Sequence, residues 1–77
     1  MMRNTKVILE ILQDGSNIND KRILELSNGK LHKGIIYMLL DYLENFGFIK
    51  SEVRYGTRRL YKITNPGKQA LEREQSK

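Results

Sequence analysis

The side chains of this sequence that could do chemistry are mainly cations, concentrated between residues 50 and 62. That segment holds five Lys or Arg residues and one acid, Glu52. Guanidinium groups pair with phosphate oxygens and enter narrow minor grooves. Arginines around a predicted turn at residues 55–57 therefore indicate contact with nucleic acid, and a charged hairpin edge that prevents aggregation is the alternative. The candidate contact residues here are Arg54, Tyr55, Thr57, Arg58 and Arg59.

Two shorter groups upstream could extend this surface. The start of one predicted helix carries Lys30, His32, Lys33 and Tyr37. There lysine can donate to guanine, and tyrosine can pack on a thymine methyl group or donate to phosphate. The start of another predicted helix carries Asn17, Lys21 and Arg22, which could fix the register on the phosphates. Solvated helix ends, and a surface histidine without a special role, are the alternatives.

The sequence lacks the residues and motifs that usually carry out catalysis. The chain has no cysteine, and its one histidine excludes a histidine metal cluster. No phosphate-binding glycine loop, HExxH motif or cysteine nucleophile occurs. Asp41 and Glu44 are interpreted as a solvated helix face rather than an acid/base pair. We therefore expect no enzyme, no metal and no cofactor.

Composition limits the class of protein further. Seventy-seven residues are enough for one domain, which we expect to span residues 1–77. A net charge of +5 and a pI of about 9.7 favour a polyanionic partner. The longest apolar run, residues 35–40, is far too short to span a membrane. The absence of cysteine fits a reducing compartment, so a cytoplasmic protein without a membrane partner is expected.

Hydrophobic spacing predicts three helices before the basic segment. The first is capped by Asn4 or Thr5 and runs to about Asp14, and an extended link or brief edge strand follows at residues 16–18. The second is capped at residues 19–20 and stops at 28–29. The third begins between Lys30 and Lys33 and ends at Gly47. Its apolar face is expected to comprise Ile35, Ile36, Leu39, Leu40, Leu43 and Phe46.

A hairpin and a last helix complete the predicted order. Residues 48–54 and 58–64 are rich in β-formers and flank a tight turn. Phe46 and Phe48 are both expected in the core. Thr64 or Asn65 caps a short final helix through Leu71, which frays over residues 72–77. The expected class is α+β: a three-helix core, a two-stranded hairpin and a short carboxy-terminal helix.

The second half of the chain resembles a known regulator pattern. Its residues Ile36-Tyr37, Leu40, Leu43-Glu44, Gly47, Phe48-Ile49, Arg59, Tyr61 to Thr64, Gly67 and Leu71 follow the motifs "LY..L..LE..GLI" and "Y.LT..G...L". They resemble the PadR-like and MarR-like winged helix-turn-helix transcriptional regulators over residues 36–71. The chain is also similar in size and element order to small winged-helix proteins of archaeal plasmids and viruses.

The resemblance implies a recognition helix in the major groove of double-stranded DNA and a wing on the backbone or minor groove. It also implies a homodimer on a roughly palindromic site, although we expect no counterpart of the long carboxy-terminal dimerisation domain of PadR-like proteins. The first and last helices are the expected dimer contacts. The resulting interpretation is a sequence-specific regulator that represses or tunes a promoter by occluding it, with its own promoter as one candidate and repression favoured by the family resemblance. A winged-helix module that binds protein instead of specific DNA is the alternative.

Overall fold

Apolar side chains at helical spacing build the core, which lies between three helices and a small sheet. The computed structural model describes residues 2–53, 56 and 58–76. Helices α1 (Arg3–Leu12), α2 (Asp20–Leu26) and α3 (Lys33–Asn45) turn their apolar stripes toward one another. Burial of these stripes, rather than helix propensity, stabilises such short helices. The apolar side chains with no exposed area, among the described residues, are Ile8, Leu9, Leu12, Ile23, Ile36, Leu40 and Leu43.

Within the described residues the sheet has three strands, one more than the two predicted for the hairpin. Strands β2 (Ile49–Glu52) and β3 (Leu60–Ile63) pair antiparallel, with Ser51 opposite Tyr61. Strand β1 (Ile18–Asn19) joins the free side of β3, so the order is β1-β3-β2. The edge strand predicted at residues 16–18 is thus present but begins at Ile18. Its position is determined by its pairing with β3, which is distant in the sequence. Both hairpin strands are shorter than predicted.

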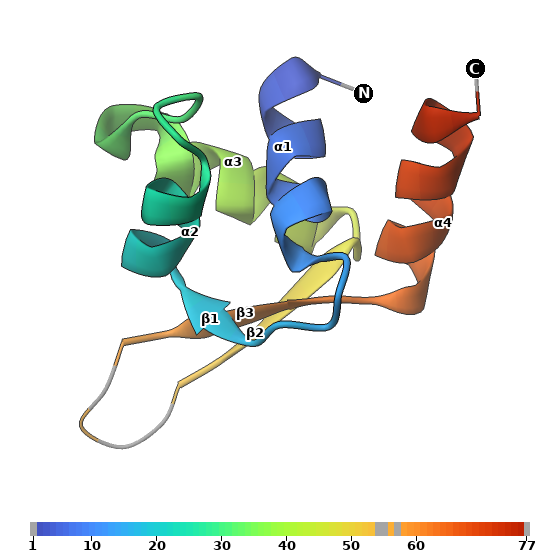
Figure 1. Ribbon diagram of the computed structural model, residues 1–77. Helices are drawn as coiled ribbons and strands as arrows, with labels where there is room; N and C mark the ends of the chain where they lie inside the picture. Colours follow the sequence, from blue (N-terminus) through green and yellow to red (C-terminus); the bar gives the residue numbers. More distant parts are fainter. Residues whose placement is uncertain (1, 54–55, 57, 77) are drawn as a thin grey trace.

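Helix α4 (Asn65–Gln75) completes the fold and packs against α1. Figure 1 shows α1, α2 and α3 above the sheet, α4 beside α1, and residues near both chain ends on the side away from the hairpin. This α+β arrangement confirms the predicted fold class. The final helix continues to Gln75, whereas the sequence predicted fraying from Glu72, because Ala70 and Leu71 are buried and anchor its middle.

A side-chain cap explains the start of α2, whereas both ends of α1 differ from the prediction. Asn19 accepts a hydrogen bond from the Arg22 backbone N–H at 2.8 Å and caps α2, as predicted. Helix α1, however, begins at Arg3 and not after Asn4 or Thr5, and it ends at Leu12 rather than near Asp14. The Thr5 hydroxyl is fully buried and donates to the Met2 carbonyl at 2.8 Å, so it bonds within the first turn instead of capping it.

The predicted core placement of Phe46 is wrong. Its side chain is 58% exposed, although Leu43, one turn earlier, is fully buried. Phe46 lies after the last residue of α3, where the chain turns through Gly47 (φ +78°). Its ring therefore packs on Tyr42 and Phe48, with centroid separations of 4.7 and 5.9 Å, at the surface. Phe48 is half-buried against the core.

Thr64 and Gly67 fix the start of α4 to the end of α3. The Thr64 hydroxyl donates to the Gly47 carbonyl at 2.5 Å and accepts from the Gly67 N–H at 3.1 Å. The Thr64 N–H donates to the Phe48 carbonyl at 3.0 Å. A Cβ on Gly67 would lie 2.0 Å from that carbonyl oxygen, so only glycine permits this approach.

Candidate nucleic-acid interface

A buried carboxylate at the start of α2 connects three elements of the proposed interface. Asp20 accepts a hydrogen bond from the Tyr37 hydroxyl of α3 at 2.6 Å through Oδ2. Its two oxygens each lie 3.3 Å from Nη1 of Arg58. Arg58 lies in the hairpin loop, two residues before β3, and we call the place where this loop joins the strands the base of the hairpin. The Asp20 side chain is 10% exposed, and that of Arg58 is 57% exposed. We call these three residues the Asp20 group.

The electrostatics of the Asp20 group favour an ionised carboxylate. Burial alone raises the pKa of Asp20, but hydrogen bonds from Tyr37 and Arg58 and the positive charge of Arg58 outweigh it, so the net pKa is lowered. The pKa of Tyr37 is raised, first by its hydrogen bond to Asp20 and then by the Asp20 charge. At neutral pH the pair is therefore a phenol donating to a carboxylate.

The exposed face of α3 begins with Lys33 and continues through Tyr37. These residues are four apart and thus lie on one side of the helix. Tyr37 is 52% exposed despite its bond to Asp20. Met38 lies beside it and is 62% exposed, although it was not among the predicted contact residues. Its position four residues after Gly34, another exposed residue, was the available signal.

The start of α3 lies within the predicted range and separates the candidate residues there into two places. The helix begins at Lys33, with His32 exposed at its amino-terminal cap position. Lys30 belongs to the preceding turn and lines a hollow with residues of the first turns of α1, including Arg3 and Lys6. The structure therefore groups Lys30 with the amino-terminal part of α1, while Lys33 shares the face of Tyr37.

The predicted residues near α2 also fall into two groups. Lys21 and Arg22 are exposed in the first turn of α2, directly after Asp20. Asn17 instead donates through Nδ2 to Glu52 of β2 at 2.7 Å. Its Oδ1 is buried and has no hydrogen-bond partner within residues 2–53, 56 and 58–76. The Asn17 side-chain amide thus connects the segment before β1 to strand β2 of the hairpin.

The two arginines at the base of the hairpin have different partners. Arg58 contacts Asp20, whereas Arg59 donates to the Ser51 hydroxyl of β2 at 3.0 Å. Ser51 in turn donates to a Glu44 carboxylate oxygen at 2.6 Å. Only Arg58 is therefore held beside the exposed face of α3. Arg54, Tyr55 and Thr57 lie outside the described residues.

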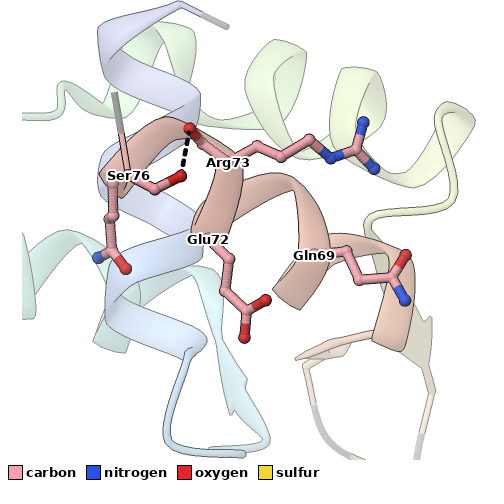
Figure 2. A pocket seen from close by; sticks show the side chains of 5 residues that line it. Gln69, Glu72, Arg73 and Ser76 are labelled. Atoms are coloured by element: carbon pink, nitrogen blue, oxygen red, sulfur yellow. Dashed lines mark hydrogen bonds between the residues drawn. The ribbon is translucent and has the colours of Figure 1, made fainter.

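The hollow on the surface of α4 is not an enclosed ligand site. This hollow of about 590 Å³ is lined by α4 and by Ser76, the residue that follows this helix. The Ser76 hydroxyl donates to the Arg73 carbonyl at 3.3 Å, and Figure 2 shows these side chains. A site on one helix lacks the facing walls that a bound small molecule needs. Across the described part of the chain, no group of three or more His, Cys, Asp or Glu could hold a metal ion. No described helix has the length and apolarity to cross a membrane.

Two solved structures with this architecture are described as transcriptional regulators. A PadR family transcription regulator from hypervirulent Clostridium difficile R20291 superposes with a TM-score of 0.83 at 25% identity, covering 94% of this chain and 82% of that one. The protein TA0346 from Thermoplasma acidophilum gives a TM-score of 0.66 at 30% identity, with 90% and 71% covered.

A more distant structure shares the fold alone. The PcaV transcriptional regulator from Streptomyces coelicolor, solved with its natural ligand, gives a TM-score of 0.84 at 17% identity. The match covers 95% of this chain and 52% of PcaV, so this chain spans about half of that regulator. No curated protein matches the sequence.

The family assignment rests on the amino-acid sequence more directly than on the fold. The family described as the transcriptional regulator PadR-like family matches residues 8–73, from the middle of α1 into α4. The match includes the Asp20 group, the hairpin and the Thr64–Gly67 link. This winged helix-turn-helix chain belongs to the PadR-like family of transcriptional regulators.

Proposed function

We propose that this protein is a repressor that binds double-stranded DNA at a specific operator, including one in its own promoter. Helix α3 enters the major groove, and the hairpin, acting as the wing, lies on the backbone or in the adjacent minor groove. The chain works in the cytoplasm as a DNA-binding protein and not as an enzyme. Its family membership supports the regulatory role, and the arrangement of its exposed cations supports the DNA contact.

The observation that carries this proposal is the contact of Arg58 and Tyr37 with one carboxylate. It brings the base of the wing beside the exposed face of α3. Lys33 lies one turn before Tyr37 on that face, and Lys21 and Arg22 follow Asp20 directly. Base contacts then come from α3, whereas Lys21, Arg22 and Arg58 neutralise phosphates and fix the register.

The same face limits how the DNA can lie. Asp41 is exposed one turn after Tyr37, and its charge repels phosphate. The duplex therefore contacts the first two turns of α3 and departs before Asp41. Met38 is well exposed within this stretch, where a flexible apolar side chain suits contact with a thymine methyl group. We add Met38 to the proposed contact residues.

Two copies on one operator fit the size of the chain. Its longest dimension is 41 Å, close to one turn of B-DNA, so a single copy covers about one half-site. A twofold pair would place two α3 helices in successive major grooves. Helices α1 and α4, which pack together beside the chain ends (Figure 1), are the proposed contacts between copies.

Selection from a randomised duplex pool, followed by fluorescence anisotropy, tests the proposal. We expect the selected duplex to bind in preference to a scrambled one. If about six phosphates are neutralised, the log-log salt slope is about −5. Lys33→Ala should weaken binding to the selected duplex about tenfold or more. Lys68→Ala is the matched control, because it removes the same charge from the exposed side of α4 and should leave the preference unchanged. Since α4 is also a proposed contact between copies, sedimentation must show that this variant keeps the oligomeric state of the unmodified protein.

Three other outcomes would each contradict a part of the proposal. Equal, salt-sensitive binding to both duplexes would contradict sequence specificity and indicate an architectural role. No binding even at low salt would refute DNA binding and favour the protein-interaction alternative. Equal losses in Lys33→Ala and Lys68→Ala would mean that net charge, and not the face of α3, governs affinity.

A further inference from the structure

We infer that Asp20 is a positioning residue for DNA recognition: without touching DNA, it holds Tyr37 and Arg58 in one arrangement and so sets the discrimination between operator and other DNA. The inference rests on the proposed function and adds a residue that the interface prediction did not contain. Asp20 is acidic and buried, and neither property is typical of a DNA contact.

The geometry separates the roles of the three residues. Asp20 lies beneath the surface, while Tyr37 and Arg58 remain more than half exposed above it. The carboxylate accepts hydrogen bonds from both, and these bonds join α2 to α3 and to the base of the wing. DNA can therefore reach the phenol and the guanidinium while both stay bound to Asp20.

Fixing these two side chains changes specific and nonspecific binding in opposite directions. A free arginine finds a phosphate on any duplex, and this contact carries no sequence information. A guanidinium held at one place fits only those duplexes whose backbone passes that place when α3 is seated. The Asp20 charge also repels phosphate, which weakens nonspecific binding further.

No competing acid in the described part of α2 duplicates this arrangement. Glu25, the other carboxylate of that helix, is exposed, and the Tyr37 and Arg58 contacts both go to Asp20. Glu25 thus offers a matched comparison, because Glu25→Gln removes one negative charge from α2 and leaves the Asp20 group intact. The two substitutions differ in position but not in their effect on net charge.

The test measures the affinity of Asp20→Asn and Glu25→Gln for a selected duplex and for a scrambled duplex at fixed salt. We expect Asp20→Asn to bind the scrambled duplex about two to three times more tightly and the selected duplex more weakly, so that discrimination falls about tenfold. Glu25→Gln should shift both affinities in the same direction and keep the ratio. Circular dichroism checks folding, and Asp20→Ser, which also suits a helix start, replaces the asparagine variant if that variant unfolds.

A double-mutant cycle separates positioning from a merely structural role. In the Tyr37→Phe/Arg58→Gln background, Asp20→Asn should no longer change discrimination, because the groups through which Asp20 acts are gone. An undiminished effect there, or an unchanged ratio in Asp20→Asn alone, would overturn the inference while leaving the proposed function standing. Absence of any DNA binding by the unmodified protein would overturn both.

Discussion

Replacing Gly67 with alanine tests the packing of this fold at its tightest point. The new Cβ would lie 2.0 Å from the Phe48 carbonyl oxygen, about 1.4 Å inside the 3.4 Å at which ordinary contact begins. It would also lie 2.8 Å from Cγ1 of Ile63. The nearest obstacle is backbone, so rotation of a side chain cannot relieve the clash, and α4 must move away from the start of β2.

The cost can be estimated from what that movement disrupts. Overpacking a rigid site costs roughly 1–3 kcal/mol. The Phe48 carbonyl also accepts the Thr64 N–H at 3.0 Å, and losing that bond adds about 1 kcal/mol. We therefore expect Gly67→Ala to lower the free energy of unfolding by about 3 kcal/mol. For a domain of this size the melting temperature should fall by roughly 12–24 °C.

Thermal and urea denaturation followed by circular dichroism measure this effect. Gly34→Ala is the matched control, since Gly34 is exposed near the start of α3 and an added Cβ meets no atom within 4 Å. There the better helix propensity of alanine should raise stability by up to about 1 kcal/mol. A melting temperature for Gly67→Ala within about 3 °C of the unmodified protein would refute the close approach of α4 to Phe48.

Two further predictions concern stability. The pKa of Asp20 in the folded state is below its ordinary value of 3.8, so its stabilising contribution is complete above that pH and is lost as pH falls through the lowered pKa. Asp20→Asn should therefore lose less stability than the unmodified protein when urea denaturation is repeated at decreasing pH below 4, and equal losses would contradict the Asp20 contacts. Leu43→Ala, at a fully buried site, should lower the free energy of unfolding by about 2–5 kcal/mol, whereas Phe46→Ala, at a side chain 58% exposed, should cost about 1 kcal/mol. Similar urea midpoints for these last two variants would mean that Phe46 is buried in solution.

The features that could be predicted from the sequence are those that local interactions determine. Asn19 and Thr64 cap their helices as expected, because each side chain accepts a hydrogen bond from a backbone N–H three residues later. Gly47 ends α3 because a positive φ suits glycine. The period of the apolar residues identified the buried stripes, and the spacing from Ile36 to Leu71 indicated the regulator family that the comparison then established.

Tertiary structure decided which side chains meet. Asp20 appeared in the sequence only as a possible helix cap, since its partners Tyr37 and Arg58 are 17 and 38 residues away. No local pattern could reveal that contact. For the same reason the sequence could not predict that Asn17 bonds to Glu52 or that β1 pairs with β3. The exposure of Phe46 likewise depends on where the chain turns after α3. Local hydrogen bonds and the periodicity of apolar residues thus determine where a helix begins and ends. Residues of different elements can act together only because the tertiary structure brings those elements side by side.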